Sequence, residues 1–187
     1  MTECKVTTLD TWLGPLTIVQ TAKGVRHAEL DDGARQFARE AAGQLTRIPG
    51  VPESAAEFEA YFAGKLQQFT SPVDLVGTPF QVRCWEAVRR IPYGEMITYA
   101  QEGLSIGTRG FQAVGQANRR NPVAILIPCH RVVGLSGPGG YFGGALWMKR
   151  ALLEFEGAHW PEEWGHEVTE NIQNECRARI DGSPGRC

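Results

Sequence analysis

The chain has 187 residues, 42% of them hydrophobic, which is enough for one domain or two small domains with a sizeable core. It shows no run of about 18 apolar residues that could span a bilayer and no charged-then-apolar leader, and its five cysteines form an odd set without close pairing. These features argue against a membrane-spanning protein and a disulfide scaffold, and they favour an intracellular protein, cytoplasmic in a bacterium or nuclear in a eukaryote. The formal net charge is −2, but residues 76–160 carry nine Lys/Arg against five Asp/Glu, which fits DNA contact on one face and fits an ordinary solvated surface equally well.

The first 75 residues predict a small mixed domain. Short runs rich in β-branched residues favour strands, and the Gly14-Pro15 pair marks a turn between the first two runs. Helical spacing of apolar residues follows, and a last β-branched run closes this half. Strands are predicted at residues 5–9, 16–20, 24–30 and 73–76, and helices at residues 34–46 and 53–64.

The second half predicts a mainly helical domain, with helices at residues 80–90, 99–106, 111–120 and 149–157. Thr98 can cap the second of these helices, and a glycine-containing turn at residues 107–110 joins it to the third in the pattern of a helix-turn-helix. The third helix is slender, because it carries Ala113, Gly115 and Ala117. Glycine inside a helix costs roughly 1 kcal/mol relative to alanine, so we expect a close approach by another surface, either a protein core or a ligand.

Two further segments have distinct compositions. Residues 134–144 contain six glycines and one proline, which predicts a loop whose backbone can approach a ligand closely. In residues 161–187 an apolar residue recurs every four positions, which predicts a helix with one apolar stripe and then a disordered end. We expect this helix to dock on the body of the protein rather than on a partner. The stripe consists of Trp164, Val168, Ile172, Cys176 and Ile180.

The most informative feature is Cys129 beside His130, directly after the apolar run Ala124-Ile125-Leu126-Ile127. A cysteine at the end of a buried apolar segment and next to a potential base is the arrangement that makes a thiolate nucleophile. An isolated Cys-His pair is more often a small core residue beside a satisfied polar neighbour. The surrounding sequence decides between these interpretations.

The stretch Asn121-Pro122-Val123-Ala124-Ile125-Leu126-Ile127-Pro128-Cys129-His130-Arg131-Val132-Val133-Gly134 closely resembles the active-site segment of the O6-alkylguanine-DNA alkyltransferases. That family moves an alkyl group from guanine O6 in DNA onto a cysteine of the protein itself. The resemblance covers most of residues 5–160. It implies an α/β (α+β) fold with a ribonuclease-H-like domain at residues 1–75, a helix-turn-helix and active-site domain at residues 76–160, and an additional extension at residues 161–187.

The implied activity is that of a single-turnover methylated-DNA–protein-cysteine S-methyltransferase, which needs no cofactor. Its implied partner is double-stranded DNA, bound through the minor groove with the alkylated guanine flipped out, and the protein is expected to be a monomer. O4-alkylthymine is a second candidate substrate. Some members of the family hold zinc in the N-terminal domain, but only Cys4 and His27 are available there, so we expect no metal.

The resemblance also implies residue roles. Cys129 is the nucleophile, His130 the base that acts through water, Glu156 the group that orients the imidazole, and Asn121 the residue that pins the helix-turn-helix to the active-site segment. Tyr99 donates to guanine N3, and the carbonyls of Cys129 and Val132 accept from the guanine amine. The remaining substrate-binding residues are Tyr141, which covers the base, Phe142, whose amide donates to O6, and Lys149. The DNA-binding residues are Arg109, Gln112, Ala113, Gly115, Ala117 and Arg119.

The chain departs from the family pattern in three places. Gln112 stands where the family has an arginine that fills the gap left by the flipped base, Phe142 stands where it has a small residue, and the extension at residues 161–187 is additional. Glutamine lacks the cation and the planar fork of arginine, so Arg109 or Phe111 could supply the missing contact. Three alternatives stay open: an alkyl acceptor with a different donor, a module that binds alkylated DNA without transfer, and, least supported, a cysteine hydrolase.

Overall fold

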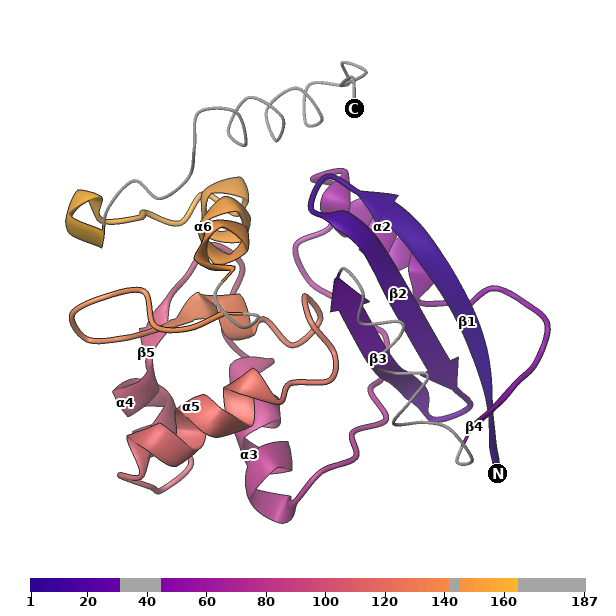
Figure 1. The fold of residues 1–187 in the computed structure, drawn as a ribbon, viewed down its shortest axis with the longest axis horizontal. Coiled ribbons are helices and arrows are strands. Elements are labelled where there is room, and N and C mark those ends of the chain that lie inside the picture. The colour runs from indigo at the N-terminus through magenta and orange to yellow at the C-terminus, as the bar shows by residue number, and fades with distance from the viewer. Residues whose placement is uncertain (31–44, 142–144, 165–187) are drawn as a thin grey trace. The chain divides into compact units, whose positions relative to one another are not determined.

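The computed structural model describes residues 1–30, 45–141 and 145–164 (Figure 1). The chain divides into two compact units. The first consists of Met1–Val76 with Pro122–Leu126, and the second consists of Gly77–Asn121 with the described residues from Ile127 onward. Across the described ranges, no helix is long and apolar enough to cross a membrane.

The first unit is a four-stranded sheet with the order β3-β2-β1-β4. Its strands are β1 (Thr2–Thr11), β2 (Gly14–Thr21), β3 (Gly24–Leu30) and β4 (Leu45–Arg47), and its described helix is α2 (Ala55–Phe62). β1, β2 and β3 form antiparallel hairpins, whereas β4 pairs in parallel with β1. α2 contacts β1 and buries Phe58 and Tyr61 completely. The three strands and the helix predicted in these ranges are therefore confirmed.

Two predictions for the first unit need correction. The helix predicted at residues 34–46 is wrong at Leu45 and Thr46, because these two residues pair with the start of β1, whereas residues 34–44 lie outside the described residues. The strand predicted at residues 73–76 is a single bridge between Val73 and Val25. Next to that bridge the Asp74 carboxylate accepts hydrogen bonds from Thr21 and Arg26, which lie in β2 and β3.

The apolar run before Cys129 belongs to the first unit up to Leu126, and its beginning lies beside β3. Ala28 donates its amide hydrogen to the Pro122 carbonyl at 3.0 Å and accepts one from Ala124 at 2.8 Å. Residues 123–127 are 0–3% exposed, as expected for a buried segment. Ile125 has a positive φ of 71°, so the run bends sharply instead of continuing as a regular strand.

The second unit contains four described α-helices and a short parallel pair of strands. The helices are α3 (Pro79–Val88), α4 (Tyr99–Ser105), α5 (Phe111–Arg119) and α6 (Leu146–Phe155). The strands are β5 (Ile97–Thr98) and β6 (Val132–Val133), and the 3-10 turns are η1 (Cys129–Arg131) and η3 (Glu162–Trp164). All four predicted helices are present, with α6 beginning three residues earlier than predicted.

The first turns of α3 and α4 are fixed by capping boxes. The side chains of Thr78 and Thr98 each accept a hydrogen bond from the backbone amide three residues later. In return, the side chains of Gln81 and Gln101 accept hydrogen bonds from the backbone amides of Thr78 and Thr98. Capping at Thr98 confirms the prediction from the sequence. The capping box also fixes the backbone at Tyr99, which is the first residue of α4.

α3, α4 and α5 pack together around Cys84, Val114 and Ala117. The Trp85 indole donates to the Ala117 carbonyl at 2.8 Å, which fastens the end of α5 to α3. Ala117 was expected at the DNA, but it is 3% exposed, so the packing of this unit explains its small side chain. Gly115 differs: a Cβ atom built there would meet only the Tyr99 ring, at 3.8 Å.

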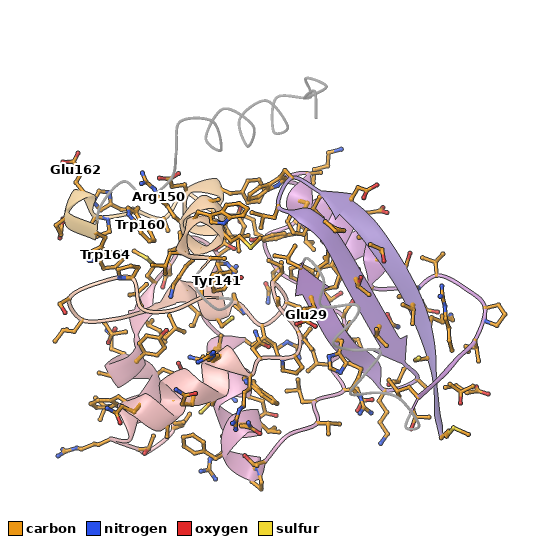
Figure 2. All side chains as sticks on the ribbon, viewed as in Figure 1. Glu29, Tyr141, Arg150, Trp160, Glu162 and Trp164 are labelled. Carbon is orange, nitrogen blue, oxygen red and sulfur yellow. The ribbon has the colours of Figure 1, made fainter. Side chains whose placement is uncertain are left out.

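The described chain ends in an aromatic contact. Trp164, the first residue of the predicted apolar stripe, packs edge-on against Trp160 with ring centroids 5.2 Å apart, and the Arg150 guanidinium lies 5.7 Å from the Trp160 centroid (Figure 2). The other four residues of the stripe lie outside the described residues. The proposed docking of that helix therefore stays a prediction.

Candidate active site

The turn η1 separates the two side chains of the Cys-His pair. The Cys129 amide donates to the Ile127 carbonyl at 2.8 Å, and the Arg131 amide donates to the Pro128 carbonyl at 2.9 Å. Cys129 is partly exposed, whereas His130 is 0% exposed. Residue 129 is therefore partly open to solvent, whereas the imidazole of His130 is shielded from it.

Asn121 is bonded to both the backbone and the sulfur. Its Nδ2 donates to the Ile127 carbonyl at 2.8 Å and to Cys129 Sγ at 3.3 Å. Burial raises the pKa of the Cys129 thiol, and the Asn121 hydrogen bond and the positive charge of Lys149 oppose that rise. The resting cysteine is therefore a thiol, and it needs a base before it can act as a nucleophile.

The imidazole of His130 is held from one side. Its Nε2 lies 2.9 Å from Glu156 Oε1, and both side chains are 0% exposed. Because a carboxylate only accepts, the neutral ring carries its hydrogen on Nε2 and presents Nδ1 as an acceptor. Nδ1 is buried and has no hydrogen-bond partner among the described residues, so it can take up a proton. Burial lowers the pKa of His130 and the Glu156 contact raises it, with a net lowering that keeps the resting ring neutral.

Glu156 is fixed by several donors. Arg131 Nε lies 2.8 Å from Oε2 and Arg131 Nη2 lies 2.9 Å from Oε1, while the Gly94 amide lies 3.3 Å from Oε2. Burial disfavours the charge on Glu156, but hydrogen bonds from His130 and Arg131 hold its pKa well below the usual range. Arg131 is itself held by the Ile91 carbonyl at 2.6 Å. His130 is therefore hydrogen-bonded to a carboxylate that stays ionised.

Gly94 is required at its position. Its φ is +77°, and a Cβ atom there would lie 2.8 Å from the Glu156 carbonyl oxygen. A side chain would therefore meet backbone strain and a clash with rigid backbone. The Tyr93 hydroxyl also donates to the Phe155 carbonyl at 3.4 Å, so this loop is bonded to the end of α6 next to Glu156.

Lys149 is a fully buried cation on the other side of the thiol. Its Nζ donates to the Val132 carbonyl at 2.6 Å and to the Gly140 carbonyl at 3.4 Å, and it lies 5.9 Å from the Tyr99 ring centroid. Burial lowers its pKa to about 8, while the nearby Cys129 raises it. A carbonyl oxygen has two lone pairs, so Val132 can accept from a ligand as well as from Lys149.

Two tyrosines lie close to this network. Gly139, with φ +73°, approaches Tyr99 so closely that a Cβ atom would lie 2.8 Å from the ring. Tyr141 is 7% exposed and meets the His130 ring edge-on at a centroid distance of 6.5 Å. Phe142, the other predicted substrate residue of the loop at residues 134–144, lies outside the described residues.

The structure thus brings most of the predicted site residues together in the second unit. Those linked by contacts are Cys129, His130, Glu156, Asn121, Lys149, Val132, Tyr99 and Tyr141. The predicted DNA-binding residues differ in exposure: Arg109, Gln112, Ala113 and Arg119 are exposed on or just before α5, whereas Gly115 is half-buried beside the Tyr99 ring and Ala117 is buried. Sequence reasoning missed Arg131, Gly94 and Gly139. Arg131 stood inside the quoted motif, whereas the two glycines gave no signal beyond their residue type.

Comparison with known proteins agrees with this arrangement. The family model described as "6-O-methylguanine DNA methyltransferase, ribonuclease-like domain" matches residues 4–75, and the model of the DNA binding domain of the same family matches residues 79–158. A methylated-DNA–protein-cysteine methyltransferase of Mycobacterium leprae is 39% identical over 157 residues, which cover 83% of this chain and 93% of the relative. One from Methanosarcina barkeri is 38% identical over 149 residues, covering 79% and 94%.

Solved structures show the same likeness. The crystal structure of Mycobacterium tuberculosis OGT in complex with DNA has a TM-score of 0.70 and 40% identity, over 82% of this chain and 92% of that chain. The O6-methylguanine-DNA methyltransferase of Pyrococcus kodakaraensis has a TM-score of 0.63 and 26% identity, over 83% and 99%. The likeness therefore spans both units.

Proposed function

Because this chain belongs to the 6-O-methylguanine DNA methyltransferase family, we propose that it repairs DNA by moving an alkyl group from guanine O6 onto its own Cys129. One observation carries the assignment of the nucleophile. The partly exposed Cys129 shares a tight turn with a buried neutral imidazole whose Nε2 is held by Glu156 and whose Nδ1 is open to a proton.

The first step removes the proton from Cys129. A thiol with a raised pKa is almost entirely protonated near neutral pH, so the thiolate forms only as the proton moves through water to His130 Nδ1. The resulting imidazolium faces the Glu156 carboxylate, which Arg131 holds in place. Other catalytic cysteine sites use the same arrangement of a nucleophile, a base and a group that orients the base.

The second step transfers the alkyl group. The Sγ lone pair forms the new sulfur–carbon bond while the bond between the alkyl carbon and guanine O6 breaks, and its electron pair leaves with the base. Tyr99 donates a hydrogen bond to guanine N3 and so stabilises the departing guanine. Lys149, which donates to the Val132 carbonyl, fixes the acceptor that we assign to the guanine amine.

The substrate guanine has to leave the duplex, because its O6 cannot reach the thiol while it is stacked. We assign Tyr99 and Tyr141 to the flipped base, and the exposed face of α5 to the minor groove. That face carries Gln112 and Arg119, with Arg109 in the preceding turn, and it offers a cation and hydrogen-bond donors to the phosphates and groove edge.

The product is a thioether, which neither His130 nor Glu156 can cleave, so each molecule acts once. The chemistry needs no cofactor. Among the described residues, no group of three or more His, Cys, Asp or Glu side chains could hold a metal ion. O4-alkylthymine is a second substrate to test, because its alkyl group is also carried on an oxygen of a flipped base.

Intact-mass analysis after incubation with duplex DNA that contains O6-methylguanine tests the proposal. The protein should gain one methyl group, and peptide mapping should place it on Cys129. A Cys129→Ser variant should still bind the lesion but gain no mass, because a serine hydroxyl is far harder to ionise than a thiol. Methylation of another residue would overturn the nucleophile assignment.

The same experiment decides between the alternatives. Tight lesion binding without any mass gain would indicate a damage-recognition module. Mass gain from a free alkylated base but not from duplex DNA would indicate a different donor, an outcome that the exposed Gln112 in place of an arginine makes worth testing.

A further inference from the structure

A carboxyl group lies buried inside the helix-turn-helix. Glu102 of α4 is 0% exposed and Asn118 of α5 is 6% exposed. Asn118 Nδ2 donates to Glu102 Oε2 at 2.6 Å, and this is the only hydrogen bond of the Glu102 carboxyl with a described residue. Glu102 Oε1 and Asn118 Oδ1 are both buried and both without a partner there.

The two unpartnered oxygens are chemically informative. An ionised carboxylate only accepts hydrogen bonds, and so does an amide oxygen, so a charged Glu102 leaves both atoms buried without a donor. A buried acceptor without a donor is unfavourable. A proton on Oε1 removes the conflict, because a carboxylic acid and a primary amide are complementary: the acid O–H donates to Oδ1 while the amide N–H donates to Oε2.

The surroundings also favour the neutral acid. The titratable groups that couple to Glu102 are Cys84 of α3, Tyr99 of α4 and Cys129 of η1, and each of them is neutral or negatively charged. Glu102 forms no ion pair with a described residue. Burial raises the pKa of Glu102 to about 7, against the lowering effect of the Asn118 hydrogen bond.

The pair is linked to the reactive thiol through Asn121. The Asn121 amide donates to the Asn118 carbonyl at 3.1 Å, and Asn121 Nδ2 in turn donates to Cys129 Sγ. Tyr99, which precedes Glu102 by three residues, begins the same helix. A change at Glu102 can therefore reach both the DNA-facing helix and the sulfur.

We propose that Glu102 is a positioning residue: as a neutral acid it fastens α4 to α5 through Asn118, and its ionisation loosens α5 and opposes thiolate formation at Cys129. The second effect is electrostatic, since a negative Glu102 disfavours a second negative charge on Cys129. The proposal rests on the proposed function, because it concerns the rate of transfer to that cysteine.

The test compares the wild type with Glu102→Gln. Glutamine offers Asn118 one acceptor and one donor, as the neutral acid does, but it cannot ionise. The control is Glu86→Gln, which changes an exposed carboxyl on α3. Transfer rates are measured between pH 6 and pH 8 from duplex DNA and from free O6-benzylguanine.

The informative quantity is the rate of the Glu102→Gln variant divided by that of the wild type, because the ordinary dependence of thiolate formation on pH cancels in this ratio. With a carboxyl pKa of about 7, the ratio should rise from near one at pH 6 towards about tenfold at pH 8 for duplex DNA. It should rise less for the free base, which does not need α5. The Glu86→Gln ratio should stay level.

A level Glu102→Gln ratio across this range would overturn the proposal. Infrared spectroscopy of the wild type gives a second measurement: a carboxylic-acid C=O band, absent from the variant, should be present at pH 6 and fade by pH 8. Its absence at pH 6 would also overturn the proposal. Failure of the proposed function is distinguishable, since the wild type would then transfer no alkyl group to Cys129 at any pH.

Discussion

Gly115→Ala separates the two reasons for a slender α5, a protein surface and a DNA surface. Gly115 lies in the middle of α5, and an added Cβ atom would meet only the Tyr99 ring at 3.8 Å, which is ordinary van der Waals contact. Alanine is favoured over glycine in a helix interior by about 1 kcal/mol, so the variant should unfold at a temperature roughly 2–4 °C higher. The described residues offer no steric reason for glycine at this position.

If the glycine serves the minor groove, the extra methyl group should obstruct duplex DNA. We expect transfer from duplex DNA to fall by roughly tenfold, equivalent to about 1.4 kcal/mol, while transfer from free O6-benzylguanine changes little. The assays are thermal unfolding and single-turnover transfer with each substrate. Ala113→Gly, at an exposed position of the same helix, is the control, because it lowers helix stability without adding bulk.

Two results would refute this reasoning. A lower unfolding temperature for Gly115→Ala would mean that the described packing around Tyr99 cannot accept a methyl group. Equal effects on duplex and free base would mean that position 115 does not meet DNA.

Three further predictions concern the network, the buried acid and the DNA face. Glu156→Gln should slow transfer by about 100-fold or more and lower the unfolding free energy by about 3–5 kcal/mol near neutral pH, because it leaves Arg131 without a counter-charge. The pKa of Glu156 is lowered, so its stabilisation is present above about pH 4.5 and is lost as the pH falls through the folded value; a variant with unchanged acid unfolding would contradict this. The pKa of Glu102 is raised from 4.5 to about 7, so between these pH values the native state keeps a proton that the unfolded chain releases. The unfolding free energy of the wild type should therefore fall by about 3 kcal/mol relative to that of Glu102→Gln as the pH rises from 4.5 to 7, which urea titrations at several pH values can measure. Gln112→Arg should speed transfer from duplex DNA and leave the free base nearly unchanged; a loss of duplex activity would show that another residue fills the gap left by the flipped base.

Local patterns predicted the elements whose pairing is local. The hairpins of β1 to β3 and the capped helices α3 and α4 have their partners or caps close in sequence, so β-branched runs and the Thr–Gln spacing were sufficient. β4 was missed because it is only three residues long and pairs with the start of β1, 43 positions earlier in the chain. The strand predicted at residues 73–76 was wrong because a run with strand-like composition forms only a single bridge, between Val73 and Val25, among the described residues.

The candidate site shows a similar division. The Cys-His pair and its motif were visible in the sequence, and the family resemblance supplied Glu156 and the two tyrosines. Arg131 was not assigned, because only the turn η1 reveals that its guanidinium reaches Glu156. Gly94 was missed because the carbonyl that a side chain there would strike belongs to Glu156, 62 positions away. In α5, residue size alone could not show that Ala117 packs inward while Gly115 stays half-buried.

The buried charges of the second unit explain why a cysteine of raised pKa is useful in a protein that acts once. A permanent thiolate would be open to oxidation while the protein waits for a lesion. Here burial keeps Cys129 protonated, while Glu156 is ionised in advance and Lys149 supplies a nearby positive charge. The unfavourable step, placing a proton on a buried imidazole, is stabilised by a carboxylate that is already oriented, so little reorganisation remains when the alkyl carbon arrives. A neutral Glu102 completes this arrangement, because a second fixed negative charge near Cys129 would oppose the thiolate that the rest of the site is built to produce.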